Sequence, residues 1–408
     1  TQPHGRKSPA AVPVAMPPRY PSAPQPDPPM PHRPSITLAA LLTLASCAAP
    51  TDPPVPDRVR IATFNIWELG TTKLLSLDSA GRGRDPQALA AAEVLQQVRP
   101  DVVLLNEIDH DYDHPDDLAL NARRFVEHYL AHGTTPIAYP YAYAAPSNTG
   151  LLTGLDLDGN GVVATDAMRG ERAHGDDSYG FGTYPGQYAM AILSRYPIDT
   201  TGVRTFQRFL WRDLPGHHIP EGWYSDAALE RFRLSSKSHW DVPVVLGADT
   251  LHLLASHPTP PVFDGPEDRN GRRNHDEIKF WVAYLGGSDA IVDDAGRHGG
   301  LVTGAPFVIL GDLNASPDQQ PPHYDDGPAI AQLLGHPDIQ DPPGHQGRAT
   351  AFFNRPSRPD YVLPARGLTI LDSGVFWPDS TSDPAGAALA AAASDHRLVW
   401  VDLGLPLR

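Results

Sequence analysis

The chain has 408 residues, 41% hydrophobic and 20% charged, which is enough apolar material for one large domain or two ordinary ones. Its formal net charge of −16 argues against loose electrostatic binding to duplex DNA or anionic lipid. A single cysteine, Cys47, excludes an internal disulfide framework and any multi-cysteine metal site.

The first 58 residues differ in composition from the rest, because they hold sixteen of the 45 prolines. Such a segment buries little apolar surface and lacks backbone donors, so we predict no packed core there. Residues 1–29 are interpreted as a disordered extension, with Met30 as the true initiator. Residues 47–57 read as a proline-rich tether, and residues 58–408 as the catalytic domain.

Residues 30–46 follow the pattern of an export signal: a short basic stretch, an apolar run over 36–45, and small residues before Cys47. Residues 44–47, Leu-Ala-Ser-Cys, resemble a bacterial lipobox, whose cysteine is lipidated and becomes the mature N-terminus. The alternatives are a plain secretory signal and a buried helix with an ordinary free cysteine. We therefore expect an exported protein, either a lipoprotein of the bacterial cell envelope or a secreted one.

Beyond residue 58, short β-rich runs alternate with amphipathic helical stretches. One helix is predicted over 86–98, where Pro86 suits the first turn, and another over 275–285. No later run is long and apolar enough to suggest another membrane attachment. Strands are predicted over 59–64, 101–105, 188–193, 251–255, 306–310, 361–363 and 398–401.

Polar residues directly follow most of these strands. Strand ends on a rigid scaffold hold catalytic groups well, and several ends on one rim can converge on a single pocket. The repetition, rather than any one residue, indicates an active site. The residues concerned are Asn65, Glu107, His257, Asp312, Asn314 and Asp395.

Four short motifs carry a resemblance to a known superfamily: residues 63–67 (TFNIW), 105–107 (LNE), 311–314 (GDLN) and 394–396 (SDH). None is decisive alone, but in this order the chain resembles the endonuclease/exonuclease/phosphatase superfamily across nearly all of residues 59–403. The resemblance implies an α/β fold: a four-layer αββα sandwich of two packed mixed β-sheets with helices outside.

The resemblance also implies roles for the residues at the strand ends. Glu107 would bind Mg²⁺, or Mn²⁺ or Ca²⁺ in its place, and Asp395 would be a metal or second-shell ligand. Asp312 would orient and deprotonate the attacking water, while Asn65 and Asn314 would hold phosphoryl oxygens.

Histidines complete the implied site. His396 would contact the phosphate and stabilise the transition state, and Asp360 would hydrogen-bond His396 and fix its tautomer. His257 would be a general acid, or a ligand on the leaving-group side of the phosphate. Each strand-end residue also has a plainer explanation: Asn65, Asp312 and Asn314 as turn formers and Asp395 as a helix cap.

Two segments depart from the minimal family pattern. The first contains Asp156, Asp158 and Asn160 at the alternate positions of an EF-hand-like calcium loop, but Ala167 stands where a bidentate acid belongs. It is either an additional structural Ca²⁺ site or a glycine-rich Asx-turn loop. The second, 206–245, is rich in aromatic residues whose tryptophans we expect to pack, with Lys237 and His239 expected to contact phosphate.

Arginines in the run 264–275, Arg273 among them, suit bidentate recognition of phosphate, although a solvated charged turn explains them equally well. The expected function is metal-dependent hydrolysis of a phosphate ester by a monomer that meets the membrane only through its lipid. The substrate is left open among nucleic acid, nucleotide, sugar phosphate and phospholipid head group. The alternative is a catalytically inactive surface-display or calcium-binding lipoprotein on the same fold.

Overall fold

The computed structural model describes residues 57–408, except for positions 264, 326 and 408. The predictions for residues 1–29, the signal over 30–46, the lipidation of Cys47 and the tether up to residue 56 lie outside this part of the chain. Among the described residues, no helix is both long and apolar enough to cross a membrane.

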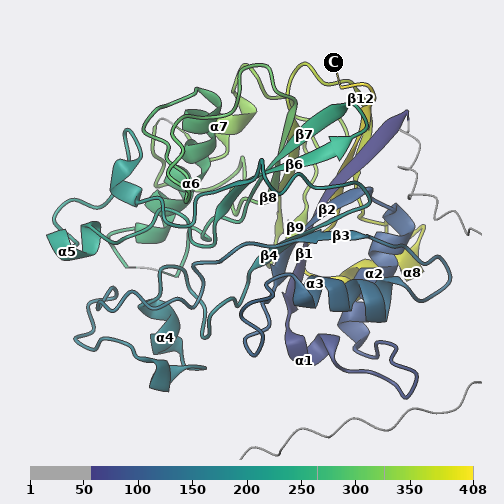
Figure 1. The fold of residues 1–408 in the computed structure, drawn as a ribbon, viewed down its shortest axis with the longest axis horizontal. Helices are drawn as coiled ribbons and strands as arrows, with labels where there is room; N and C mark the ends of the chain where they lie inside the picture. Colours follow the sequence, from purple (N-terminus) through teal and green to yellow (C-terminus); the bar gives the residue numbers. More distant parts are fainter. Residues whose placement is uncertain (1–56, 264, 326, 408) are drawn as a thin grey trace, which may run out of the picture. The chain divides into compact units, whose positions relative to one another are not determined.

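Two mixed sheets form the centre of the fold (Figure 1). In each sheet a parallel pair of strands lies at the centre, β1 beside β2 and β7 beside β8, with antiparallel neighbours on both sides. The first sheet has the order β12 (Ile370–Val375), β13 (Val399–Gly404), β1 (Arg58–Leu69), β2 (Val102–Ile108), β4 (Met190–Ser194), β3 (Tyr141–Tyr143). The second has the order β11 (Asp360–Pro364), β8 (Phe307–Asp312), β7 (Asp249–Ser256), β6 (His239–Leu246), β5 (Arg204–Thr205).

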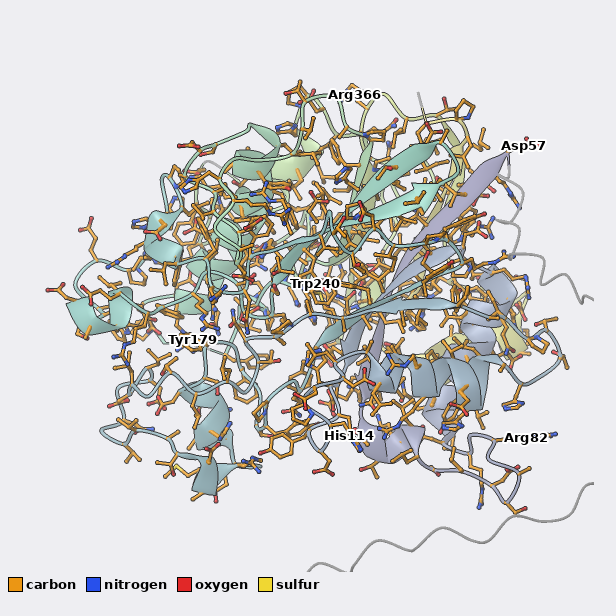
Figure 2. All side chains as sticks on the ribbon, in the orientation of Figure 1. Asp57, Arg82, His114, Tyr179, Trp240 and Arg366 are labelled. Carbon is orange, nitrogen blue, oxygen red and sulfur yellow. The ribbon has the colours of Figure 1, made fainter. Side chains whose placement is uncertain are left out.

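The two sheets pack face to face through an apolar layer to which both contribute, for example Ile61 and Leu104 from one and Val242 and Leu253 from the other. Trp240 on β6, fully buried in this layer, is labelled at the centre of the molecule in Figure 2. Because helices cover the outer faces, the central strands are buried on both sides and read as nearly continuous apolar runs.

Helices close the sandwich on both outer faces (Figure 1). The first sheet is covered by α2 (Pro86–Val98), α3 (Leu120–Phe125), the π-helical turn η1 (Val126–Leu130) and α8 (Pro384–Ala393). The second sheet is covered by α6 (Arg269–Leu285) and α7 (Ala331–Leu334). The predicted four-layer αββα sandwich is therefore present. The connections between these layers contain short elements: α1 (Thr71–Leu74), η2 (Asp166–Met168), α4 (Arg172–Asp176), η3 (Trp211–Asp213), α5 (Asp226–Leu229) and the hairpin of β9 (Ala351–Phe352) and β10 (Pro356–Ser357).

Several elements differ from the sequence-based predictions, and three of these differences bear on the site. The first strand runs to Leu69 rather than stopping at Asn65, although its regular pairing with β2 breaks after Asn65. Helix α6 begins at Arg269, before the predicted start at residue 275, because its first turns bury polar rather than apolar side chains. Strand β6 was not predicted, since its sequence HWDVPVVL lacks alternation when both faces are buried.

Candidate active site

The carboxyl ends of the two parallel strand pairs meet at one pocket. Glu107 belongs to the end of β2 and Asp312 to the end of β8, while His257 directly follows β7. All three line a pocket of about 500 Å³, together with Asn314, Asp395 and His396. The expected convergence of strand ends is thus realised by segments that are far apart in the sequence.

Asp312 lies at the centre of the polar contacts. Its Oδ2 accepts a hydrogen bond from Asn65 Nδ2 at 3.0 Å and lies 3.4 Å from His257 Nε2 and 3.7 Å from His396 Nε2. Its Oδ1 accepts a hydrogen bond from the Asn314 backbone N–H at 2.9 Å. The two oxygens therefore have separate tasks, since Oδ1 closes an Asx turn while Oδ2 faces the catalytic groups.

Close packing against the neighbouring strand β7 explains why a glycine, Gly311, precedes Asp312. At a φ of +148°, a Cβ built on Gly311 would lie 1.9 Å from the carbonyl oxygen of Ser256 on the neighbouring strand β7. Any side chain would push β8 away from β7 and carry Asp312 away from His257. The glycine of the GDLN motif is thus a packing requirement of the site.

His396 and Asp360 form a buried pair behind Asp312. The Nδ1 of His396 lies 2.9 Å from Asp360 Oδ2, which also accepts a hydrogen bond from Thr350 Oγ1 at 2.7 Å. Burial works against the charged imidazolium, but Asp360 and Asp312 outweigh it and raise the pKa of His396 to about 10. With Nδ1 committed to Asp360, the Nε2–H of His396 points toward Asp312 and the pocket.

The same contacts keep Asp312 ionised. Burial alone would raise the pKa of the Asp312 carboxyl, but the His396 and His257 rings and the Asn65 amide outweigh it and hold the pKa below its ordinary value. His257 behaves in the opposite way, because burial and the nearby Lys237 ammonium lower the pKa of its imidazole. The pocket therefore sets a neutral and a charged histidine on either side of one carboxylate.

Glu107 has the surroundings of a cation ligand. One of its oxygens accepts a hydrogen bond from Asn65 Nδ2 at 3.0 Å, and its ligand atoms lie within 4.8 Å of those of His257 and Asp312. No Lys or Arg among the described residues forms an ion pair with Glu107 or Asp312. The Nδ1 atom of His257 is also buried and has no hydrogen-bond partner among the described residues. Two closely spaced carboxylates that form no ion pair with Lys or Arg fit a hard divalent ion.

Asp395 lies on the rim of the pocket and is half-buried. Among the described residues, the closely spaced ligand set around Glu107 is completed by His257 and Asp312 and not by Asp395. The neighbouring Ser394 Oγ donates to the Asn65 carbonyl at 2.8 Å and accepts from the His396 N–H at 3.0 Å. The SDH motif thus ties His396 to Asn65 within β1.

Lys237 and His239 are placed differently from each other. Lys237 is nearly buried and lines the pocket, where its ammonium interacts with Glu277, Glu107 and Asp312. His239 does not reach the pocket: its Nε2 lies 2.8 Å from the Glu277 carbonyl, its Nδ1 contacts Ser235, and its ring packs on Phe280. The expected phosphate contact by His239 is therefore wrong, because β6 begins at this residue and turns it into the helix-covered face of the sheet.

Arg273 lines the pocket, but its guanidinium is largely used by the fold. Its Nε donates to the Leu234 carbonyl at 2.7 Å and its Nη2 to the Tyr179 carbonyl at 2.6 Å. Burial lowers the pKa of Arg273 to about 10. Because these bonds use Nε and Nη2, few N–H groups of the guanidinium are left for the bidentate phosphate contact that the sequence suggested.

Glu277 was not anticipated. It is one turn beyond Arg273 on α6 and 1% exposed, and its carboxylate accepts from Ser236 N at 2.6 Å and from Thr259 N at 2.7 Å. It therefore ties together the loop that carries Lys237 and the loop that follows His257. A carboxylate on the apolar face of a predicted helix is the signal that could have identified it.

Comparison with known proteins places the chain in a family. The profile of the Endonuclease/Exonuclease/phosphatase family matches residues 62–396, which includes all four motifs. The chain belongs to the endonuclease/exonuclease/phosphatase family. Members of this family act on phosphate esters and generally depend on divalent metals. No curated protein matches the sequence.

Three solved structures illustrate the breadth of similar folds. An endonuclease/exonuclease/phosphatase from Beutenbergia cavernae is 18% identical, with 86% of this chain and 72% of that chain covered and a TM-score of 0.49. The human Nocturnin catalytic domain is 11% identical, with 85% and 93% covered and a TM-score of 0.45. Sphingomyelinase C from Streptomyces griseocarneus is 14% identical, with 85% and 99% covered and a TM-score of 0.40.

The family site is walled by strained and aromatic residues. Ten non-glycine residues in the described chain have a positive φ, and six of them line the pocket, which is where functional strain usually gathers. Phe353 packs edge-on against the His396 ring at 5.0 Å. The six strained wall residues are Trp67, Glu68, Glu107, Tyr188, Phe263 and Asn314.

A further wall comes from the segment between β3 and β4, which contributes Leu157, Arg172 and Phe181. It includes the predicted calcium loop. The carboxylates of Asp156 and Asp158 lie close to that of Asp177, a residue that the sequence analysis did not predict. The Nδ2 of Asn160 donates a hydrogen bond to Asp158 Oδ2 at 2.8 Å. The carboxylates also accept backbone hydrogen bonds, for instance Gly161 N to Asp156 at 2.8 Å. Binding of Ca²⁺ by this loop stays a prediction.

Proposed function

We propose that this chain hydrolyses a phosphate ester at phosphorus, with a divalent cation held at Glu107 and an attacking water held by Asp312. The observation that carries the proposal is the position of Asp312 Oδ2, which meets Asn65, His257 and His396 at the floor of a pocket. A carboxylate so placed is ionised, fixed in direction and open to a small molecule.

The cation would be Mg²⁺, or Mn²⁺ or Ca²⁺ in its place, because the ligands offered are mainly hard oxygens. Glu107 would hold it, with His257 and Asp312 within reach as further ligands, while Asp395 on the rim of the pocket stays a predicted ligand. When bound, such an ion neutralises the negative charge that keeps a nucleophile away from a phosphate ester.

Asp312 orients a water and takes its proton as the new P–O bond forms, while the ester P–O bond on the opposite side breaks. Because the pKa of Asp312 is below its ordinary value, the carboxylate is ionised but is a weak base in the ground state. Asn65 limits its rotation, and Asn314, whose Nδ2 donates to the Pro258 carbonyl at 3.0 Å, keeps the turn closed.

His396 and Lys237 supply positive charge on either side of the reacting phosphate. The imidazolium of His396 can donate its Nε2–H to a phosphoryl oxygen and stabilise the charge that develops there. Lys237 forms no ion pair within 4.0 Å among the described residues, so its amino group could contact a phosphoryl oxygen, although burial lowers its pKa. The departing oxygen takes its proton from solvent, because His257, which is neutral and lies 3.4 Å from Asp312, has no acidic proton to give.

The pocket favours a compact substrate. Its volume of about 500 Å³ falls in the range of small-molecule sites, and the segment between β3 and β4 closes one side of it. A nucleotide, sugar phosphate, phospholipid head group or flexible nucleic-acid end fits this shape better than a duplex. The inactive surface-display alternative is disfavoured, because Glu107, Asp312, Asp360 and His396 are all present and come together.

The proposal is tested by assaying a phosphate diester and its matching monoester with and without EDTA. Wild type is compared with Asp312→Asn and with Asp338→Asn, an exposed aspartate as the matched control. We expect EDTA to abolish activity, Asp312→Asn to lower kcat by about 10³-fold or more, and Asp338→Asn to match wild type. Full activity of Asp312→Asn, or of wild type in EDTA, would overturn the mechanism.

A further inference from the structure

A second group of potential metal ligands lies outside the active-site pocket. His218, His275 and Asp325 bring one ligand atom each within 4.8 Å of one another, and none of the three lines the pocket. They come from three separate parts of the chain: the aromatic-rich segment after β5, helix α6 and the loop before residue 326. Their convergence is therefore a property of the fold.

Both imidazoles are oriented by one buried carboxylate. Asp276 Oδ1 lies 2.7 Å from His218 Nδ1 and 3.3 Å from His275 Nδ1, and Asp276 is fully buried. Its other oxygen accepts from Trp211 Nε1 and from the His218 N–H, each at 2.6 Å. An anion that engages both Nδ1–H groups fixes the tautomers and leaves the Nε2 lone pair of each ring available, as in carboxylate–histidine–zinc arrangements.

The available nitrogens point toward Asp325. His218 Nε2 lies 3.4 Å from Asp325 Oδ1, and His275 Nε2 lies 3.8 Å from Asp325 Oδ2. The His275 side chain is 1% exposed, and its Nε2 has no hydrogen-bond partner among the described residues. Burying a polar atom without a hydrogen-bond partner destabilises the fold by about 1–3 kcal/mol, so a bound ligand at His275 Nε2 would be stabilising.

These separations suit a small tetrahedral ion. With ligand distances of about 2.0–2.2 Å, a tetrahedral Zn²⁺ keeps its ligand atoms roughly 3.3 Å apart. Lys279 Nζ already donates to Asp325 Oδ2 at 2.7 Å, so Asp325 would ligate through Oδ1 and keep Lys279 on its second oxygen. Asp325 is about half exposed, which leaves an entry path and room for a water as fourth ligand.

We propose that His218, His275 and Asp325 form a zinc site, with Asp276 as the carboxylate that holds both imidazoles. Two imidazoles and one carboxylate favour Zn²⁺ over Mg²⁺ or Ca²⁺, which prefer oxygen ligands alone. The ion ties the segment containing His218 and the loop containing Asp325 to α6, the helix that also carries Arg273 and Glu277. Its role is to hold these three parts together, separate from the phosphate chemistry.

The test uses the whole chain carrying Glu107→Gln, so that the catalytic cluster contributes less to metal binding. After chelation and dialysis, bound Zn²⁺ is measured by elemental analysis, and Co²⁺ serves as a tetrahedral absorption reporter. We expect one bound Zn²⁺, lost or weakened at least tenfold by Asp325→Asn and by His275→Gln, and weakened about 10–100-fold by Asp276→Asn.

His217→Gln is the matched control, since His217 is exposed and adjacent to His218. It should bind Zn²⁺ as the Glu107→Gln parent does, and excess Mg²⁺ should not compete. Because Asp325 lies in a half-exposed loop, Asp325→Asn tests the site even if His275→Gln fails to fold. The proposal is overturned if the parent binds no Zn²⁺ or if Asp325→Asn binds it with unchanged affinity.

Discussion

Single residues in this protein often combine a structural and a chemical task. Asp312 closes a turn with one oxygen and faces the pocket with the other, so the turn-former and catalytic interpretations of the GDLN motif apply to different atoms. Asn65 donates to both Glu107 and Asp312 and thereby sets the spacing of the two carboxylates. A substitution at either position would disturb local geometry and chemistry together.

The buried histidine His345 should make the stability of the protein depend on pH. His345 Nε2 lies 2.8 Å from the Trp400 carbonyl, and burial lowers the pKa of His345 to about 4. The unfolded chain, with a histidine pKa of about 6.5, binds a proton between pH 6.5 and 4 that the native state does not. Stability therefore falls as the pH drops through this window.

His345→Gln should remove this contribution. In urea unfolding between pH 4.5 and 6, we expect the free energy of unfolding of the variant to change less steeply with pH than that of wild type, by up to about 1.4 kcal/mol per pH unit. His298→Gln, at an exposed position, should keep the wild-type slope. Equal slopes for His345→Gln and wild type would refute the assignment.

At the scale of elements, the site depends on loops that α6 holds in place. Glu277→Gln would exchange one acceptor oxygen for a donor facing Ser236 N or Thr259 N, loosening the loop of Lys237 or that of His257. We expect kcat/KM to fall about 10–100-fold, chiefly through kcat, with a lower melting temperature. The exposed Glu230→Gln should change neither. A folded Glu277→Gln enzyme with wild-type kcat would show that Glu277 does not position the loops.

Site residues next to strands with a clear apolar pattern could be predicted from the sequence, and others could not. Glu107 and Asp312 stand at the ends of strands with clear apolar patterns, so each could be placed at a strand end from the sequence. Because β2 and β8 belong to different sheets, their meeting also depends on how the two sheets pack face to face. His239 was misplaced because β6 was not recognised, and the direction of a side chain depends on strand register. Asp177 and the His218 cluster depend on contacts between distant loops, which no local pattern encodes.

At the scale of the whole molecule, the two-sheet scaffold carries the active-site pocket, and we predict that the segment before the scaffold decides where the protein is located. The lipobox-like residues 44–47 predict that the chain, expressed in a bacterium, partitions into the detergent phase of Triton X-114. Cys47→Ser should move it to the aqueous phase, because the thiol that carries the lipid is lost. Ser46→Ala is the control and should behave as wild type. Identical partitioning of all three proteins would argue against a lipid anchor at Cys47.

The proposed reaction requires that a water attacks phosphorus directly. The measurement that tests it most directly is hydrolysis of a phosphate diester in H₂¹⁸O under single-turnover conditions, with mass analysis of both products. Attack of water at phosphorus should place one ¹⁸O in the phosphate-containing product and none in the released alcohol. Label in the alcohol, or an unlabelled phosphate product in the first turnover, would contradict it.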